Sequence, residues 1–326
     1  MMNIDQNLLN LIGNTPIIKV TKIDTGMCEL YLKLENQNPG GSIKDRIAVS
    51  MINDAEQRGR LKPGGTIVEA TAGNTGLALA LVGINRGYKL LFVIPDKMSA
   101  AKINHLKAMG AEIRLTRSDV EKGHPEYYQD LAENLAKDIP NSFYINQFGN
   151  PSNSQAHYEW TGPEIWQQMN HNLNAIVCGV GTGGTLTGIG NYMREVAPDL
   201  EMILADPVGS ILAPLINTGE KVKPGKWLVE GIGEDYIPSI CDISLATKAY
   251  SISDREAFDT ARLLLKSEGI YAGSSSGVLI AAAVKYCLEQ NSPKRVLTFV
   301  CDGGAKYQDK MYNEQWLLEK QQQGLL

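Results

Sequence analysis

Short apolar runs alternate with helical stretches along most of the chain, and this alternation restricts the possible folds more than any other feature. The runs are continuous, which is typical of strands buried on both faces. We therefore predict an α/β fold built on twisted, mostly parallel sheets flanked by helices, with ligands bound beyond the carboxyl ends of the strands. The predicted strands cover residues 67–70, 89–94, 111–115, 175–180, 201–205 and 295–300. The predicted helices cover residues 47–58, 75–86, 99–109, 126–137, 186–196, 254–267 and 277–289.

The length and composition fit a soluble protein of two domains. A chain of 326 residues is longer than one hydrophobic core usually supports. Contents of 43% hydrophobic and 21% charged residues are ordinary for a globular protein. The net charge of -5, without a basic run, gives no reason to expect a nucleic-acid partner. No apolar stretch is long enough to span a bilayer and no signal peptide is recognisable, so we expect a cytoplasmic protein without a membrane partner.

The cysteines and histidines give no sign of a disulfide framework or a metal site. The five cysteines are scattered and form no CxxC pair, and the four histidines lack the spacing of metal ligands. We therefore predict a protein of a reducing compartment with no bound metal.

One lysine stands out because of its place at the start of a predicted helix. The segment 38–46 reads NPGGSIKDR, so a Pro-Gly-Gly turn brings Ser42 and Lys44 to the beginning of the helix. The positive end of the helix dipole and partial burial favour a neutral, nucleophilic amine. Such an amine can form an imine with an aldehyde.

Three further loops lie between a predicted strand and a predicted helix. Residues 69–76 (EATAGNTG) offer hydroxyls and backbone N–H groups that suit a carboxylate or a phosphate. Residues 179–188 (GVGTGGTLTG) offer a longer run of backbone donors and threonine hydroxyls, suited to a phosphate dianion. Residues 273–277 (GSSSG) open the third helix.

Each of these motifs also has a purely structural explanation when it is taken alone. Lys44 is compatible with a solvated turn, and the loops at 69–76 and 273–277 are compatible with helix caps. Only the loop at 179–188 has too many glycines and threonines for packing to explain. It lacks the GK[ST] of a Walker loop, and its glycine spacing is poor for a dinucleotide site.

Taken together, the motifs resemble a known family in their order along the chain. The segments PGGSIKDR, EATAGNTG, YINQFGNPSN, VGTGGTLTG, VEGIGEDYIP and EGIYAGSSSG are similar to motifs of the fold-type II enzymes that use pyridoxal 5′-phosphate (PLP). Within that group the chain resembles cystathionine β-synthase and O-acetylserine sulfhydrylase (cysteine synthase). The similarity extends from Leu11 to about Trp316.

The resemblance implies a role for each motif. Lys44 is the expected Schiff-base lysine and the acid and base at Cα. The other expected cofactor contacts are Asn74 to the ring oxygen, Gly181, Thr182, Gly183, Gly184 and Thr185 to the phosphate, and Ser275 to the pyridine nitrogen. The expected substrate contacts are Thr71, Asn74, Thr75 and Gln147 to the amino-acid carboxylate, and Gly231 and Asp235 at the entrance for the second substrate.

The resemblance also implies an organisation of the chain. We expect a smaller, mobile domain over residues 46–150, a larger cofactor-binding domain over 1–45 plus 151–320, and a frayed tail over 321–326. We further expect a homodimer with one active site in each subunit.

The expected reaction is β-replacement on serine or O-acetylserine by a thiol. Residues 205–213 (ADPVGSILA) and 234–238 (EDYIP) are closer to the synthase that uses homocysteine than to the sulfhydrylase. The carboxylate loop departs from the family because Ala72 replaces a serine. A lost hydrogen bond to a charged group costs about 1.5–3 kcal/mol, so we expect altered affinity rather than a different reaction.

Four alternatives remain open from the sequence. The closest is a cysteine synthase that uses sulfide, and serine or threonine deamination is a second within the fold. A non-catalytic binding module on the same fold and a nicotinamide-dependent dehydrogenase belong to other classes. Lys44 disfavours the binding module, and the glycine spacing disfavours the dehydrogenase.

Overall fold

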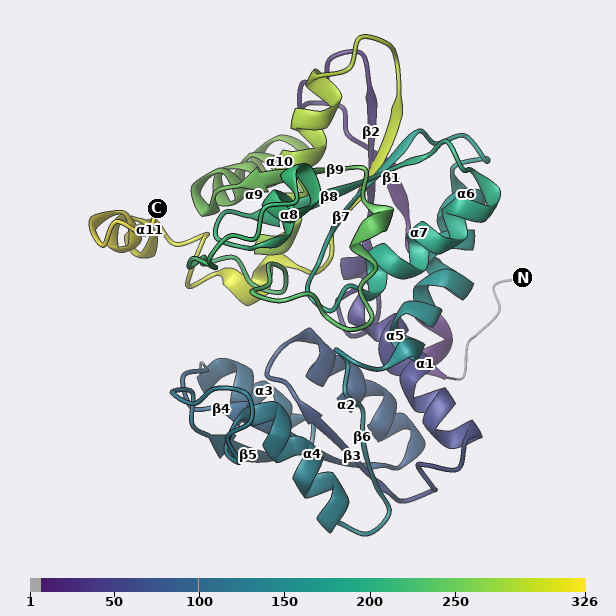
Figure 1. Cartoon of the computed structure of the whole chain (residues 1–326), viewed down its shortest axis with the longest axis vertical. Helices are drawn as coiled ribbons and strands as arrows, with labels where there is room; N and C mark the ends of the chain where they lie inside the picture. The colour runs from purple at the N-terminus through teal and green to yellow at the C-terminus, as the bar shows by residue number, and fades with distance from the viewer. Residues whose placement is uncertain (1–6, 99) are drawn as a thin grey trace. The chain divides into compact units, whose positions relative to one another are not determined.

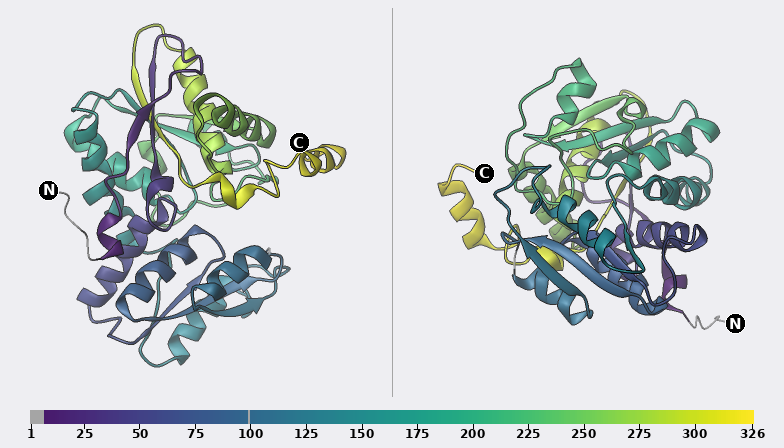
Figure 2. Two further views of the ribbon diagram at one scale, coloured as in Figure 1. Left: turned by 180° about the vertical axis from the view of Figure 1, so that it is seen from behind. Right: turned by 60° about the horizontal axis from the view of Figure 1, so that its bottom comes forward.

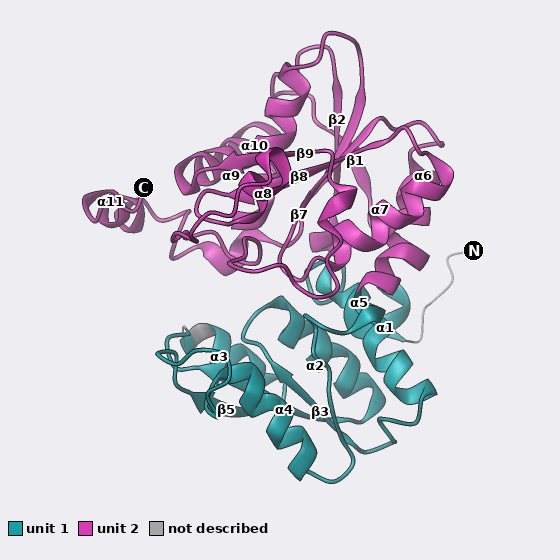
Figure 3. Ribbon diagram, in the orientation of Figure 1, with its two compact units in different colours: residues 1–12, 38–153 teal, residues 13–37, 154–326 magenta. Residues whose placement is uncertain are grey.

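The computed structural model describes residues 7–98 and 100–326, and the chain divides into two compact units (Figure 3). Unit 1 contains the chain up to Ile12 together with Asn38–Asn153. Unit 2 contains Gly13–Gln37 and Ser154–Leu326. The smaller domain expected over residues 46–150 falls inside unit 1, which also takes in residues 38–45. Residue 99, the first of the predicted helix 99–109, lies outside the described residues.

Unit 1 is built on a four-stranded parallel sheet with the strand order β5-β4-β3-β6 (Figure 1). Its strands are β3 (Thr66–Ala70), β4 (Lys89–Pro95), β5 (Glu112–Thr116) and β6 (Ser142–Tyr144). Its helices are η1 (Leu8–Leu11), α1 (Lys44–Gln57), α2 (Asn74–Arg86), α3 (Ala100–Ala108) and α4 (Tyr128–Asp138).

The two faces of this sheet follow from the alternation of side chains along β3. Val68 and Ala70 belong to a core cluster against which α4 packs Leu131 and Leu135. The intervening residues of the strand point to the other face. There α2 approaches so closely that a Cβ on Gly83 would lie 2.7 Å from Leu90 Cδ2. Glu69 therefore belongs to the face that α2 covers.

Unit 2 is built on a six-stranded sheet with the strand order β1-β2-β10-β7-β8-β9. All neighbouring pairs are parallel except β1 with β2. Its strands are β1 (Ile17–Lys19), β2 (Glu29–Lys33), β7 (Ala175–Gly179), β8 (Glu201–Pro207), β9 (Lys248–Ile252) and β10 (Arg295–Phe299). Helices α9 and α10 lie over one face of this sheet, and α6 and α7 lie over the other (Figures 1 and 2).

The helices of unit 2 include a short π-helical segment, η3. They are η2 (Glu35–Gln37), η3 (His157–Thr161), α6 (Gly162–Gln168), α7 (Gly184–Val196), α8 (Leu212–Thr218), η4 (Ile243–Leu245), α9 (Asp254–Glu268), α10 (Ser274–Leu288), η5 (Gly304–Tyr307) and α11 (Glu314–Gln322). Helix α5 (Pro151–Ala156) runs across the junction of the two units at Asn153. Helix α11, which reaches into the segment expected to fray, projects from the rest of unit 2 (Figure 2).

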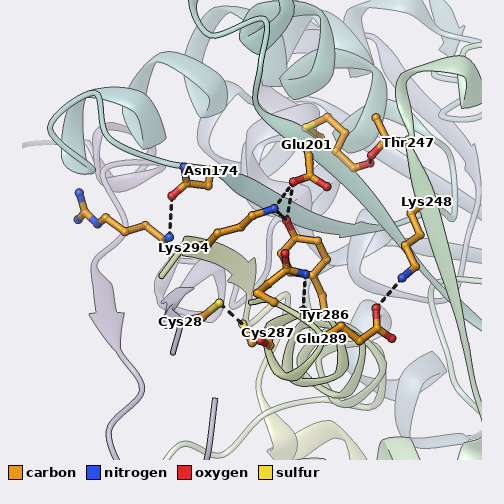
Figure 4. A network of polar contacts seen from close by, with 12 residues as sticks. Cys28, Asn174, Glu201, Thr247, Lys248, Tyr286, Cys287, Glu289 and Lys294 are labelled. Carbon is orange, nitrogen blue, oxygen red and sulfur yellow. Dashed lines mark hydrogen bonds and ion pairs between the residues drawn. The ribbon is translucent and has the colours of Figure 1, made fainter. Parts of the chain in front are cut away.

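A polar network ties α10 to the sheet of unit 2 (Figure 4). The buried Tyr286 hydroxyl donates to Glu201 on β8 at 2.8 Å and accepts from Lys294 at 2.8 Å. Lys294 also pairs with Glu201. On the neighbouring strand, Lys248 pairs with Glu289 at the end of α10. These contacts connect the C-terminal end of α10 to strands β8 and β9.

The predicted α/β architecture with mostly parallel sheets is confirmed, and the structure corrects where several helices begin. Helices were predicted to start at residues 47, 186 and 277, but they start at Lys44, Gly184 and Ser274. The helices thus begin inside the polar loops, which places loop residues in the first turn. Strands β1, β2, β6 and β9 were not predicted, because they are short or mix polar with apolar residues. Within the described residues, no helix has the length and apolarity needed to cross a membrane.

Candidate active site

Lys44 is the first residue of α1 and follows a tight turn. Gly41, with φ of 76°, donates its N–H to the Asn38 carbonyl at 2.7 Å. The backbone N–H of Lys44 donates to the Ser42 hydroxyl at 3.3 Å. A side chain at Gly40 would meet the Asp45 carboxyl, which accepts the Gly40 N–H. Lys44 is half-buried on a helix whose next residues are buried, so the turn and the helix fix the backbone from which its side chain extends.

The predicted carboxylate loop lies in the same unit, where β3 passes into α2. The Thr71 hydroxyl accepts the Gly73 N–H at 3.3 Å, and Asn74 is the first residue of α2. The Thr75 hydroxyl donates to Gln147 Oε1 at 2.6 Å. Gln147 follows β6, the strand next to β3. The structure therefore brings together Thr75 and Gln147, although they are far apart in sequence.

The predicted phosphate loop lies in unit 2, between β7 and α7. Gly183 caps α7 in the left-handed conformation, with φ of 85°. A Cβ there would lie 2.2 Å from Cys241 Cβ, and a Cβ on Gly181 would lie 2.4 Å from the Gly231 carbonyl oxygen. Glycine is thus required at both positions. The first N–H groups of a helix have no partner within that helix, so the start of α7 offers donors to an anion.

The three serines that open α10 have different surroundings. The Ser274 hydroxyl accepts the Glu230 N–H at 3.1 Å, and the Ser276 hydroxyl accepts the Cys301 N–H at 2.9 Å. These two bonds fix the loop to its neighbours. Ser275 lies between them, takes part in neither bond and is the most exposed of the three, at 6%, which makes it the serine best suited to contact a ligand.

The predicted entrance segment joins the phosphate loop to the serine loop. The Gly233 N–H donates to the Val180 carbonyl at 2.8 Å, while Glu230 contacts Ser274 as described. Three segments distant in sequence therefore meet within unit 2: residues 180–185, 230–235 and 273–277. Asp235 is exposed at the edge of this arrangement.

Sequence reasoning missed several groups that surround these loops. The His157 ring lies 3.3 Å from the Thr185 hydroxyl through Nε2 and 2.9 Å from the Thr161 hydroxyl through Nδ1. Burial raises the pKa of Glu234 to about 8, and the charges of Asp235 and Asp206 add to the effect. Burial likewise raises the pKa of Asp206 to about 6. The isolated His157 carries no signal in one sequence. Asp206 and Glu234 lie in segments that the sequence singles out, but only the tertiary structure shows that they are buried.

Each unit carries its own set of polar groups. Unit 1 carries Lys44 at the start of α1 and the loop between β3 and α2. Unit 2 carries the glycine cradle at the start of α7 and Ser275 at the start of α10. Among the residues with a described placement, no cluster of three or more metal-binding side chains is found.

The sequence matches the family described as pyridoxal-phosphate dependent enzyme over residues 8–302. The chain belongs to this family. It is therefore a PLP-dependent enzyme, and the resemblance drawn from the motifs is confirmed. Membership disfavours both the dehydrogenase and the non-catalytic binding module.

Individual relatives carry two kinds of name. The chain is 43% identical over 314 residues to the cystathionine beta-synthase of Apis mellifera, covering 95% of this chain and 62% of that protein. It is 40% identical over 324 residues to cysteine synthase 1 of Neurospora crassa, covering 97% of this chain and 86% of that protein. A hydrogen sulfide-producing enzyme of Fusobacterium nucleatum has a similar structure, with a TM-score of 0.85 and 36% identity over 93% of this chain and all of that chain. The chain thus spans about three fifths of the synthase and most of the other two.

Proposed function

We propose that the chain catalyses β-replacement on L-serine or O-acetyl-L-serine, with homocysteine as the thiol and cystathionine as the product. Both kinds of named relative support a PLP-dependent β-replacement in general. The choice of homocysteine rests on the exposed side chain of Asp235, considered below.

The residues proposed to hold PLP are those that fit its separate groups. Lys44 would hold the aldehyde carbon, and Asn74 would donate to the ring oxygen. The loop from Gly181 to Thr185 would bind the phosphate, and the Ser275 hydroxyl would contact the pyridine nitrogen. When bound, PLP supplies an electron sink that makes the Cα proton of an attached amino acid acidic.

The chain's own residues would orient the amino acid and move its proton. Thr71, Asn74, Thr75 and Gln147 would bind the carboxylate, which fixes the Cα–H bond relative to the lysine. The Lys44 amine, once exchanged for the substrate amine, would take the Cα proton and return it after the thiol has added at Cβ. A hydroxyl is the poorer leaving group and an acetoxy group the better one, so both donors belong in the test.

The observation that carries the choice of thiol is the exposed acidic side chain of Asp235 at the proposed entrance. The Ser210 hydroxyl accepts the Glu234 N–H at 3.0 Å and donates to the Glu234 carbonyl at 3.1 Å, which locks the loop beside β8. Asp235 stays exposed next to it. A carboxylate at this point attracts the ammonium group of homocysteine and repels an anionic sulfide. We infer that Gly231 and Asp235 receive the second substrate.

The second candidate is cysteine synthesis from sulfide. It is supported by the 40% identity to cysteine synthase 1 of Neurospora crassa. We also propose a cytoplasmic location, because the scattered cysteines fit a reducing compartment, and a homodimer, on the motif resemblance alone.

A substrate matrix tests the proposal. Purified, PLP-loaded enzyme is assayed with serine and with O-acetylserine, each with homocysteine and with sulfide, at equal concentrations. We expect the largest kcat/KM with homocysteine, and cystathionine as the product identified by mass spectrometry. A larger kcat/KM with sulfide for both donors would instead establish the second candidate.

A further inference from the structure

Glu69 is a buried acid next to the proposed carboxylate loop, and none of the roles above uses it. It lies near the carboxyl end of β3, two residues before Thr71, and is 1% exposed. The alternation along β3 turns it toward the face covered by α2, the helix that Thr75 helps to open. Its Oε2 atom has no hydrogen-bond partner among the described residues. A buried carboxyl costs free energy unless its contacts compensate for lost hydration, so its presence here calls for a reason.

The contacts of Glu69 converge on the segment that carries Gln147. Burial raises the pKa of the carboxyl to about 8, although hydrogen bonds from the Ala70, Gln147 and Asn146 backbone amides and from the Gln147 side chain act in the opposite direction. Near neutral pH the group is therefore largely uncharged. An uncharged acid does not repel a carboxylate bound nearby.

Gln147 is consequently held at several points. Its side-chain oxygen accepts from Thr75 at 2.6 Å, and its carbonyl accepts from Asn153 Nδ2 at 2.8 Å. Its side chain and its backbone amide also contact the Glu69 carboxyl. An amide group has two N–H bonds and one oxygen. Because the oxygen accepts from Thr75, the NH₂ group is the part of the side chain that can donate to Glu69. A donation there would fix the rotation of the amide and leave one N–H to donate elsewhere.

We propose that Glu69 is a positioning residue for the amino-acid carboxylate, acting by fixing the Gln147 amide so that its remaining N–H donates to the substrate. This inference rests on the proposed function, because it assumes that Gln147 binds the carboxylate. Glu69 itself does not touch the substrate.

The test compares two ligands that differ only in the carboxylate. L-Alanine has no leaving group at Cβ, and L-alaninamide lacks the negative charge. Calorimetric titration of the PLP-loaded enzyme gives the ratio of their dissociation constants. Glu69→Met removes both oxygens at similar volume, and we expect it to lower the preference for alanine about tenfold or more. Glu69→Gln keeps one acceptor for the Gln147 amide, and we expect a preference within about threefold of the wild type.

Two further variants serve as controls, one for a general loss of stability and one for a Glu69→Met protein that fails to fold. Thr116→Val removes a partly buried hydrogen bond from the Thr116 hydroxyl to the Glu126 carbonyl. Thr116 lies on β5, at the opposite edge of the same sheet from β6. The Thr116→Val variant should have a lower melting temperature and an unchanged preference. Glu69→Asp shortens the side chain by one methylene, which moves the carboxyl away from Gln147, and it should also lower the preference for alanine. It therefore provides the test of the role of Glu69 if Glu69→Met does not fold.

The outcomes distinguish a failure of the proposed role of Glu69 from a failure of the proposed carboxylate loop. A wild type that prefers alanine, with the preference unchanged in Glu69→Met and Glu69→Asp, overturns the role of Glu69 alone. A wild type that binds alanine and alaninamide equally well overturns the proposed carboxylate loop, and the role of Glu69 with it.

Discussion

Replacing Gly183 by alanine tests whether the glycine cradle at the start of α7 is both a structural requirement and a cofactor site. Gly183 has φ of 85°, and a Cβ there would lie 2.2 Å from Cys241 Cβ. The left-handed conformation costs about 1–2 kcal/mol for a residue with a Cβ. Relieving the overlap with Cys241 costs about 1–3 kcal/mol more. The expected loss of stability is therefore about 2–5 kcal/mol.

Gly269 provides a matched control in the same unit. It caps the end of α9 with φ of 75°, and nothing lies within 4 Å of the Cβ that alanine would add. Gly269→Ala should therefore lose only the conformational contribution, about 1–2 kcal/mol. The difference between the two variants isolates the steric overlap at the cradle.

The assay has two parts. Denaturant unfolding of the PLP-free proteins gives the free energy of unfolding without a contribution from bound cofactor. Visible absorbance after dialysis of the loaded proteins gives the fraction of PLP retained. We expect Gly183→Ala to lose PLP, because moving the start of α7 displaces its amide donors, and Gly269→Ala to retain it. Equal losses of stability in the two variants, with full retention of PLP in both, would show that the start of α7 is neither sterically crowded at Gly183 nor a cofactor site.

Three other predictions concern separate parts of the chain. Tyr286→Phe removes the hydroxyl that links Glu201 and Lys294. It should lower the free energy of unfolding by about 1–3 kcal/mol, measured by thermal unfolding, and leave KM unchanged. An unchanged melting temperature would contradict the structural role of the network. Because burial raises the pKa of Glu69 from 4.5 in the unfolded chain to about 8, the folded state binds more protons between these values, so stability should fall as pH rises from about 4.5 to 8. Glu69→Gln should show a shallower fall over that range, and parallel profiles would be evidence against a raised pKa. Asp235→Asn should raise KM for homocysteine by up to about fivefold and leave KM for serine unchanged, whereas equal effects on both would argue against a role in selecting the thiol.

The sequence predicts the strands that are buried on both faces, because a continuous apolar run is a local signal. The run at residues 175–180 and the run at 295–300 both form strands, β7 and β10. The strand order is not local information. β2 lies beside β10 although nearly the whole chain separates them, and β2 carries the fully buried Lys33 in place of an apolar residue.

In the candidate site too, some residues are predictable from the sequence and others are not. The loop motifs are predictable because anion-binding loops need glycine and hydroxyl residues next to one another in sequence. The groups that support them are not predictable, because they act across long sequence separations. Glu69 and Gln147 are one example, and Thr185 with His157 is another. In both cases the supporting residue would pass for an ordinary core or surface residue in the sequence.

The most direct test of the account concerns the amine at residue 44. Borohydride reduction of the PLP-loaded enzyme fixes the cofactor to the amine that carries it, and digestion with mass spectrometry identifies that residue. We expect the added mass on the peptide containing Lys44, and none in a Lys44→Ala variant. Cofactor mass on a different lysine, or on the variant to the same extent as on the wild type, would contradict it.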